Sequence, residues 1–145
     1  MTRIDFHSNV SNQLDYACRL VRKALAAKCH LVVRHQNKEQ LAQFNQLLWE
    51  FSATDFLPHV AIHEGPHPLT QHTPVLLSLD AESDIPESTH MQILLNLSDQ
   101  VPTDFARFER LIEIVPQAAQ ATQAGRERYR FYQQQGYQLN HIHAK

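Results

Sequence analysis

Short apolar runs alternate along the chain with stretches in which apolar residues recur every three or four positions. Four runs rich in Leu, Ile and Val have the pattern of buried strands in a parallel sheet, namely residues 30–34, 74–79, 92–97 and 111–115. Residues 3–7 alternate as a shorter strand does, and residues 137–142 are predicted to add an edge strand. Helical patterns separate several of these strands. The sequence therefore predicts an α/β fold, a Rossmann-like three-layer sandwich with a mostly parallel central sheet.

The helical stretches carry recognisable start signals. The first helix is predicted to end at Ala27, and polar residues at its start are the candidate N-caps, Ser8, Asn9 and Ser11. Its apolar stripe consists of Leu14, Ala17, Cys18, Val21 and Leu25. A second helix is expected over about residues 38–49, with Asn37 as its cap and Glu39 in its first turn. Pro116 is predicted in the first turn of the last helix, where its missing N–H costs nothing.

Length and composition indicate a single globular domain over residues 1–145. Hydrophobic residues make up 43% of the chain and charged residues 19%, as is typical of a protein that folds alone. The net charge of −2 gives no overall positive field for binding nucleic acid. Cys18 and Cys29 are expected to be small buried residues in a reducing environment. With no signal-peptide pattern and no long apolar run, we expect a cytoplasmic protein without a membrane span.

Patterns for nucleotide binding and catalysis are missing from the sequence. The three glycines, Gly65, Gly125 and Gly136, form neither a G-x-G-x-x-G nor a Walker-type phosphate-binding loop. No serine lies in a nucleophile-elbow context, and neither cysteine has neighbours that would activate it. The sequence therefore predicts no cofactor and no catalytic residues.

Two clusters of polar residues suggest metal binding but are better explained as loops. Four histidines lie close together, His59, His63, His67 and His72, but prolines and Gly65 break the segment, so the regular spacing does not place them on one helical face. The acidic residues Asp80, Glu82, Asp84 and Glu87 lie along a proline-containing stretch typical of a solvated connector. We expect no metal site.

Two other segments are candidates for binding. Arg126, Tyr129 and Arg130 share one face of the predicted last helix, and guanidinium groups beside a tyrosine can bind a carboxylate. The alternative is a solvated helix whose arginines lie over the fold. Trp49 and Phe56, near the end of the second helix, are either core residues or an aromatic protein interface.

These segments together resemble the chi subunit family of bacterial DNA polymerase III. The resemblance rests on Leu48-Trp49, on Phe56-Leu-Pro-His59, and on the closing Arg126-Glu-Arg-Tyr129-Arg-Phe-Tyr132 with Gly136-Tyr-Gln-Leu139. It spans nearly the whole chain. It implies a nucleotide-binding-like α/β sandwich without enzymatic activity, which acts in DNA replication as an adaptor. Such an adaptor pairs with the psi subunit of the clamp loader and binds the acidic C-terminal tail of single-stranded DNA-binding protein, so that it contacts DNA indirectly.

The resemblance also implies roles for individual residues. Arg126 resembles the family residue that holds the terminal carboxylate of the tail, and Tyr129 and Arg130 match its neighbours. Val115 and Leu139 match apolar positions that receive the last side chain of the tail.

Other positions are also matched. Thr122 stands where the family can have a lysine, which removes one cationic contact. Trp49 and Phe56 match aromatic residues of the psi surface, which some relatives also offer to a helicase. Two alternatives to the adaptor stay open, a nucleotide-binding or nucleotide-using enzyme of Rossmann-like fold and a direct binder of single-stranded nucleic acid.

Overall fold

The computed structural model describes residues 2–51, 59–61, 73–79 and 92–144. These residues form one seven-stranded sheet in the order β3-β4-β2-β5-β6-β1-β7, in which every neighbouring pair is parallel. The strands are β1 (Arg3–Val10), β2 (Leu31–Arg34), β3 (His59–Ala61), β4 (Val75–Ser78), β5 (Ile93–Asn96), β6 (Arg110–Pro116) and β7 (Leu139–His143). The helices are α1 (Gln13–Ala26), α2 (Lys38–Phe51), the short 3-10 helix η3 (Phe105–Arg107) and α4 (Ala119–Gln134).

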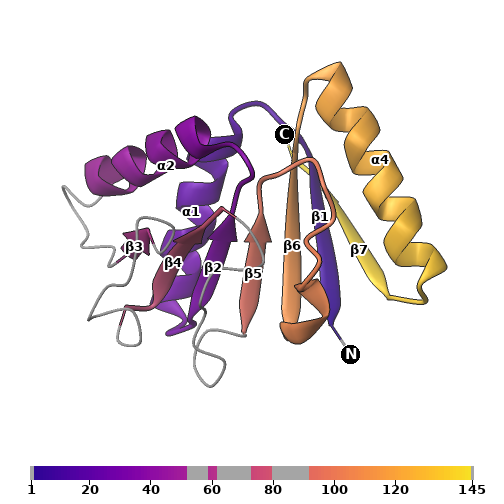
Figure 1. Cartoon of the computed structure of the whole chain (residues 1–145), viewed down its shortest axis with the longest axis horizontal. Helices are drawn as coiled ribbons and strands as arrows, with labels where there is room; N and C mark the ends of the chain where they lie inside the picture. Colours follow the sequence, from indigo (N-terminus) through magenta and orange to yellow (C-terminus); the bar gives the residue numbers. More distant parts are fainter. Residues whose placement is uncertain (1, 52–58, 62–72, 80–91, 145) are drawn as a thin grey trace.

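The helices cover the two faces of the sheet (Figure 1). Helices α1 and α2 pack on one face, where the buried cluster includes Val21, Phe44 and the strand residue Val33. Helix α4 and η3 pack on the other, where the cluster includes Tyr132, Phe105 and Val32. Because successive residues of a strand point to opposite faces, the continuous apolar runs supply both clusters. The predicted three-layer α/β sandwich is confirmed, and in the described residues its sheet is parallel throughout.

Most predicted elements lie where the apolar patterns placed them. The stripe of α1 is buried at Leu14, Ala17, Cys18 and Val21, and Leu25 packs partly buried against the same cluster. The backbone N–H of Gln40 donates to the Asn37 side chain at 3.0 Å, which confirms the predicted cap of α2. The predicted edge strand is confirmed as β7, which pairs with β1 alone among the described strands.

Three local predictions are wrong, two because a strand reaches further than expected and one because a strand was not predicted. The first strand runs on to Val10, so Ser8 and Asn9 lie in the sheet and α1 is capped instead by Asn12, whose side chain accepts from the N–H of Asp15 at 3.1 Å. Pro116 pairs with Val10 and ends β6, and α4 begins three residues later.

The third correction concerns the histidine-rich stretch. His59 was expected in a loop but begins strand β3, where it pairs with Val75. The remaining histidines of that stretch and the four acidic residues of the predicted connector, Asp80, Glu82, Asp84 and Glu87, lie outside the described residues.

A buried carboxylate, Asp5, ties β1 to both of its neighbours. It accepts hydrogen bonds from Arg110 of β6 at 2.7 Å and from the side-chain amide of Asn140 of β7 at 3.1 Å. Burial opposes its ionisation, but these hydrogen bonds and the positive charges of Arg110 and Arg3 hold the pKa of Asp5 below its usual value.

Candidate functional site

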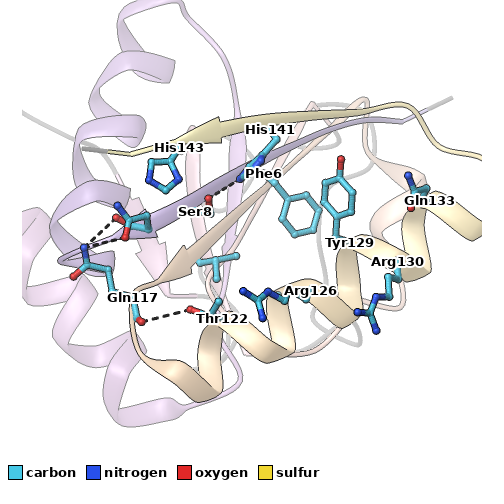
Figure 2. Close-up of a pocket in the computed structure, with 13 residues that line it drawn as sticks. Phe6, Ser8, Gln117, Thr122, Arg126, Tyr129, Arg130, Gln133, His141 and His143 are labelled. Carbon is cyan, nitrogen blue, oxygen red and sulfur yellow. Dashed lines mark hydrogen bonds between the residues drawn. The ribbon is translucent and has the colours of Figure 1, made fainter.

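A groove lies between α4 and the strands β1, β6 and β7, and its volume is about 690 Å³ (Figure 2). One wall is a face of α4 and the other is formed by alternate residues of β1 and β7. The lining residues are Phe6, Ser8, Asn9, Val115, Gln117, Thr122, Gly125, Arg126, Tyr129, Arg130, Gln133, His141 and His143.

The lining residues of α4 recur at intervals of three and four positions, so their side chains share one face of the helix. Arg126 and Arg130 both line the groove and are exposed, and Figure 2 shows Tyr129 pointing from the helix toward the strands. Tyr129 is half-buried, and its ring meets that of Phe6 edge to face with centroids 5.1 Å apart. The groove thus has cationic groups beside an aromatic floor.

Gly125 sets the distance between the helix and the strand beneath it. A Cβ atom at this position would lie 2.9 and 3.0 Å from the two γ-carbons of Val115, closer than carbon atoms normally approach. Only a glycine lets α4 come this near to β6. Val115 therefore forms part of the groove floor and is also the residue of β6 on which α4 packs at Gly125.

A buried polar network holds the opposite face of α4. The carboxylate of Glu113 in β6 is fully buried and accepts hydrogen bonds from Arg128 Nε at 3.1 Å and from the Tyr132 hydroxyl at 2.6 Å. The Asn96 side-chain amide of β5 donates to it at 2.9 Å. Burial raises the pKa of Glu113, against the effect of these donors, and burial together with the Glu113 charge raises the pKa of Tyr132. The network fixes the rotation of the helix, because Arg128 and Tyr132 point into the fold while Arg126 and Arg130 face the groove.

The strand wall is brought together by parallel pairing. Phe6 lies beside His141, and Ser8 lies beside His143, in the register of β1 and β7. The Ser8 hydroxyl and Nε2 of His141 are 2.6 Å apart, as the dashed line in Figure 2 marks. Both histidines are exposed.

The charges of the groove all have one sign. Among its lining residues, Arg126 and Arg130 carry fixed positive charges, and none is an aspartate or a glutamate. Such a groove suits an anionic ligand that also has an apolar part. The arrangement offers donors and an apolar floor. Ser8 and His141 are in hydrogen-bond contact, but the lining residues include no carboxylate that could orient the imidazole as in a serine-histidine-aspartate triad.

Four of the five residues predicted to bind a carboxylate tail meet in this groove: Arg126, Tyr129, Arg130 and Val115. Leu139 does not line it and instead packs, half-buried, against the buried cluster that includes Phe6 and Tyr132. Thr122 does line the groove, and its hydroxyl donates weakly to the Pro116 carbonyl at 3.4 Å.

Neither the histidines of the strand wall nor the buried network around Glu113 was predicted from the sequence. Glu113 carried a signal, because a carboxylate within the apolar run of residues 111–115 must find partners when buried. The histidines of β7 carried none, because only the pairing with β1 brings them opposite α4.

The second predicted surface is only partly described. Trp49, near the end of α2, is 53% exposed, and its ring centroid lies 4.7 Å from that of His59. Phe56 falls outside the described residues. Trp49 is therefore a surface residue that packs on the first residue of β3.

The usual ligand position of this fold is filled by the protein itself. In open parallel sheets, ligands bind where the chain passes to opposite faces, here between the carboxyl ends of β2 and β5. The Arg34 guanidinium is buried there and donates to both oxygens of Asp104, at 2.7 and 3.0 Å, and to the Ser78 hydroxyl at 3.0 Å. A nucleotide at this point would have to displace a buried, bidentate ion pair.

The described parts of the chain also bear on metal binding and on membrane insertion. Within residues 2–51, 59–61, 73–79 and 92–144, no three or more His, Cys, Asp or Glu side chains are grouped so as to hold a metal ion. None of the helices in these ranges is both long enough and apolar enough to cross a membrane.

Comparison with known proteins gives consistent matches over almost the whole chain. The family described as "DNA polymerase III chi subunit, HolC" matches residues 1–140. DNA polymerase III subunit chi of Pseudomonas aeruginosa is 32% identical over 143 residues, covering 96% of this chain and 94% of the relative. The proteins of the same name from Haemophilus influenzae and Escherichia coli are each 24% identical, over 127 and 123 residues, covering 87% and 85% of this chain and 83% and 80% of the relatives.

Proposed function

Because the chain belongs to the DNA polymerase III chi subunit family, a family of non-catalytic accessory subunits of the replisome, we propose that it is an adaptor with two binding surfaces. The groove along α4 binds the acidic C-terminal tail of single-stranded DNA-binding protein. The surface around Trp49 binds a psi-type subunit of the clamp loader.

The observation that carries the first part is the chemistry of the groove. Arg126 and Arg130 line one wall, Val115 and the Phe6–Tyr129 ring pair form an apolar floor, and no carboxylate lines the groove. A peptide with acidic residues and an apolar last side chain needs cationic groups to bind its carboxylates and an apolar surface to contact its last side chain. The groove supplies both within one short stretch of helix.

Such a contact is expected to be of modest strength. Micromolar binding, about −8 kcal/mol, is typical of a short peptide that fills one groove. Because Arg126 and Arg130 are exposed, added salt should weaken it. Many tails on one coated DNA strand would raise the effective concentration and offset the weakness of each contact.

The test is isothermal titration with the C-terminal peptide of single-stranded DNA-binding protein. Arg126→Ala should cost about 2 kcal/mol, or about 30-fold in Kd, and Arg126→Lys should not restore binding because an ammonium cannot make the bidentate contact. Amidating the terminal carboxylate of the peptide should have the same effect as the alanine variant. Arg22→Ala, an exposed arginine on α1, is the matched control and should bind normally. Unchanged affinity in Arg126→Ala would reject the site.

Indirect contact with DNA distinguishes the adaptor from a direct DNA binder. The isolated protein should not bind a bare single-stranded oligonucleotide at physiological salt, since the net charge is −2 and the described cationic groove is short. It should associate with the oligonucleotide once single-stranded DNA-binding protein is bound to it, and removal of the last residues of that protein should abolish the complex. Tight binding to naked DNA would contradict the proposal.

The psi surface is supported by the exposure of Trp49, which is 53% exposed at the end of α2. Large aromatic residues left on a surface are frequent anchors of protein interfaces. Trp49 fluorescence should shift to shorter wavelength when a psi-type subunit binds, and Trp49→Ala should lose that subunit while keeping the peptide of single-stranded DNA-binding protein. Co-purification of the subunit with Trp49→Ala at the wild-type level would exclude this surface.

A further inference from the structure

The strand wall of the groove presents two imidazoles that face the arginines of α4. His141 and His143 lie two residues apart in β7, so both side chains point to the same face of the sheet. Both line the groove and both are exposed (Figure 2). The groove is therefore bounded by guanidinium groups on one side and by imidazoles on the other.

The spacing of the two histidines suits an extended peptide. Residues two apart in a strand are separated by about 6.6 Å, which is also the separation of alternate side chains in an extended ligand. A peptide that lies along β7 can thus offer one acidic side chain to each imidazole. Its terminal carboxylate meanwhile reaches Arg126 across the groove.

The hydrogen bond between Ser8 and His141 orients one of the rings. The Ser8 hydroxyl is 2.6 Å from Nε2 of His141, which makes Nδ1 the ring nitrogen that can turn toward a ligand. A hydroxyl both donates and accepts, so this contact persists in either protonation state of the ring. The Tyr129 ring, whose centroid lies 6.3 Å from that of His141, restricts the space into which the His141 ring can move on the side of α4.

Every charged group that lines the groove opposite these histidines is cationic. From α4 the titratable or charged lining residues are Arg126, Tyr129 and Arg130; the lining residues of β1 and β6, and the residues between β6 and α4, are uncharged. The carboxylates of a bound peptide favour the charged form of an imidazole that they contact, so binding should be accompanied by proton uptake.

We propose that His141 and His143 form a second anion-binding subsite, which binds the acidic side chains that precede the terminal carboxylate of the peptide. The subsite rests on the proposed function, because it assumes that an acidic peptide occupies the groove. It makes the two histidines determinants of specificity for acidic tails, and it makes the affinity of the groove dependent on pH.

The test measures anisotropy of a labelled acidic C-terminal peptide between about pH 8 and about pH 6 at constant ionic strength, a range in which carboxylates stay ionised and imidazoles gain a proton. The affinity of the wild-type protein should rise about fivefold or more toward the acidic end. His141→Asn combined with His143→Asn should abolish most of this rise. His30→Asn, a histidine outside the lining of the groove, is the matched control and should keep it.

Two further measurements separate a binding role from a structural one. Calorimetry in two buffers of different ionisation enthalpy should show proton uptake by the wild-type protein and its loss in the double variant. A peptide whose acidic side chains are replaced by amides, with its terminal carboxylate kept, should bind both proteins with little pH dependence. Circular dichroism should show the same melting temperature for both proteins, because the substituted side chains are exposed.

The outcomes distinguish the two proposals. If the wild-type protein binds no acidic peptide at any pH, the proposed function fails. If binding depends on Arg126 but is flat with pH, or if the double variant keeps the full rise in affinity, the tail site stands and the histidine subsite is wrong.

Discussion

Gly125→Ala tests the close approach of α4 to β6, on which the groove depends. The added Cβ would lie 2.9 and 3.0 Å from the γ-carbons of Val115, whereas carbon atoms in contact are normally about 3.5–4.0 Å apart. Val115 is buried, and its β-branched side chain is stiff at χ1, so it cannot easily turn away. The helix must therefore move outward by about 0.5 Å or more, and Arg126, the next residue, moves with it.

The expected magnitude combines two opposing effects. Replacing glycine by alanine inside a helix stabilises it by about 1 kcal/mol, whereas inserting a methylene into a packed interior costs about 1–3 kcal/mol. The net result should be a loss of about 1 kcal/mol in the free energy of unfolding, measured by urea denaturation. Peptide binding should weaken several-fold in the same variant, because the arginines no longer stand at their original distance from the strand wall.

Val115→Ala provides the control, because it removes the two carbons that the new methyl group would meet. Combined with Gly125→Ala, it should give a loss of stability smaller than the sum of the single losses by about 1 kcal/mol or more. If instead Gly125→Ala is more stable than the wild-type protein by about 1 kcal/mol, binds peptide normally and shows no coupling to Val115→Ala, then α4 does not lie as close to β6 as described.

Three other predictions concern the rest of the fold. The pKa of Asp5 is held below its usual value, so its contribution to stability is present above about pH 4 and is lost as pH falls further; Asp5→Asn should flatten the acid limb of a stability–pH profile measured by urea denaturation. Burial raises the pKa of the Cys18 thiol to about 12, so alkylation at about pH 8 should modify the less buried Cys29 first and Cys18 only on unfolding, as mass spectrometry would show. Trp49→Ala should cost less than about 2 kcal/mol of stability in urea, against about 3–5 kcal/mol for a buried tryptophan, because the side chain is 53% exposed.

The sequence predicted the layers of this fold because the signals involved are local and strong. Residues 31–34, 75–78 and 93–96 are apolar enough that only a sheet covered on both faces can bury them. The position of Arg126, Tyr129 and Arg130 on one face follows from helical periodicity alone, and the structure places all three in one groove.

What the sequence could not predict depends on contacts between distant segments. The strand that ends at Val10 is longer than its pattern suggests because Pro116 pairs with it, and this pairing displaces the helix starts on both sides. The orientation of Arg128 away from the groove depends on Glu113, fifteen residues earlier in the chain. Helical spacing says which arginines share a face, but the buried carboxylate decides which face points inward.

The position of β1 in the sheet has a consequence for the order in which the protein folds. This strand is made before the other described strands, yet its only partners among them are β6 and β7, more than 100 residues later. Until those strands are made, residues 3–10 have no strand partner among the described elements, and the apolar side chains of Ile4, Phe6 and Val10 stay unburied, as in segments that aggregate or recruit chaperones. The groove combines residues from Phe6 to His143, so a nascent or prematurely terminated chain that lacks β7 cannot complete it. If the groove binds the tail as proposed, a chain that stops before β7 should not bind it, because His141 and His143 would be missing.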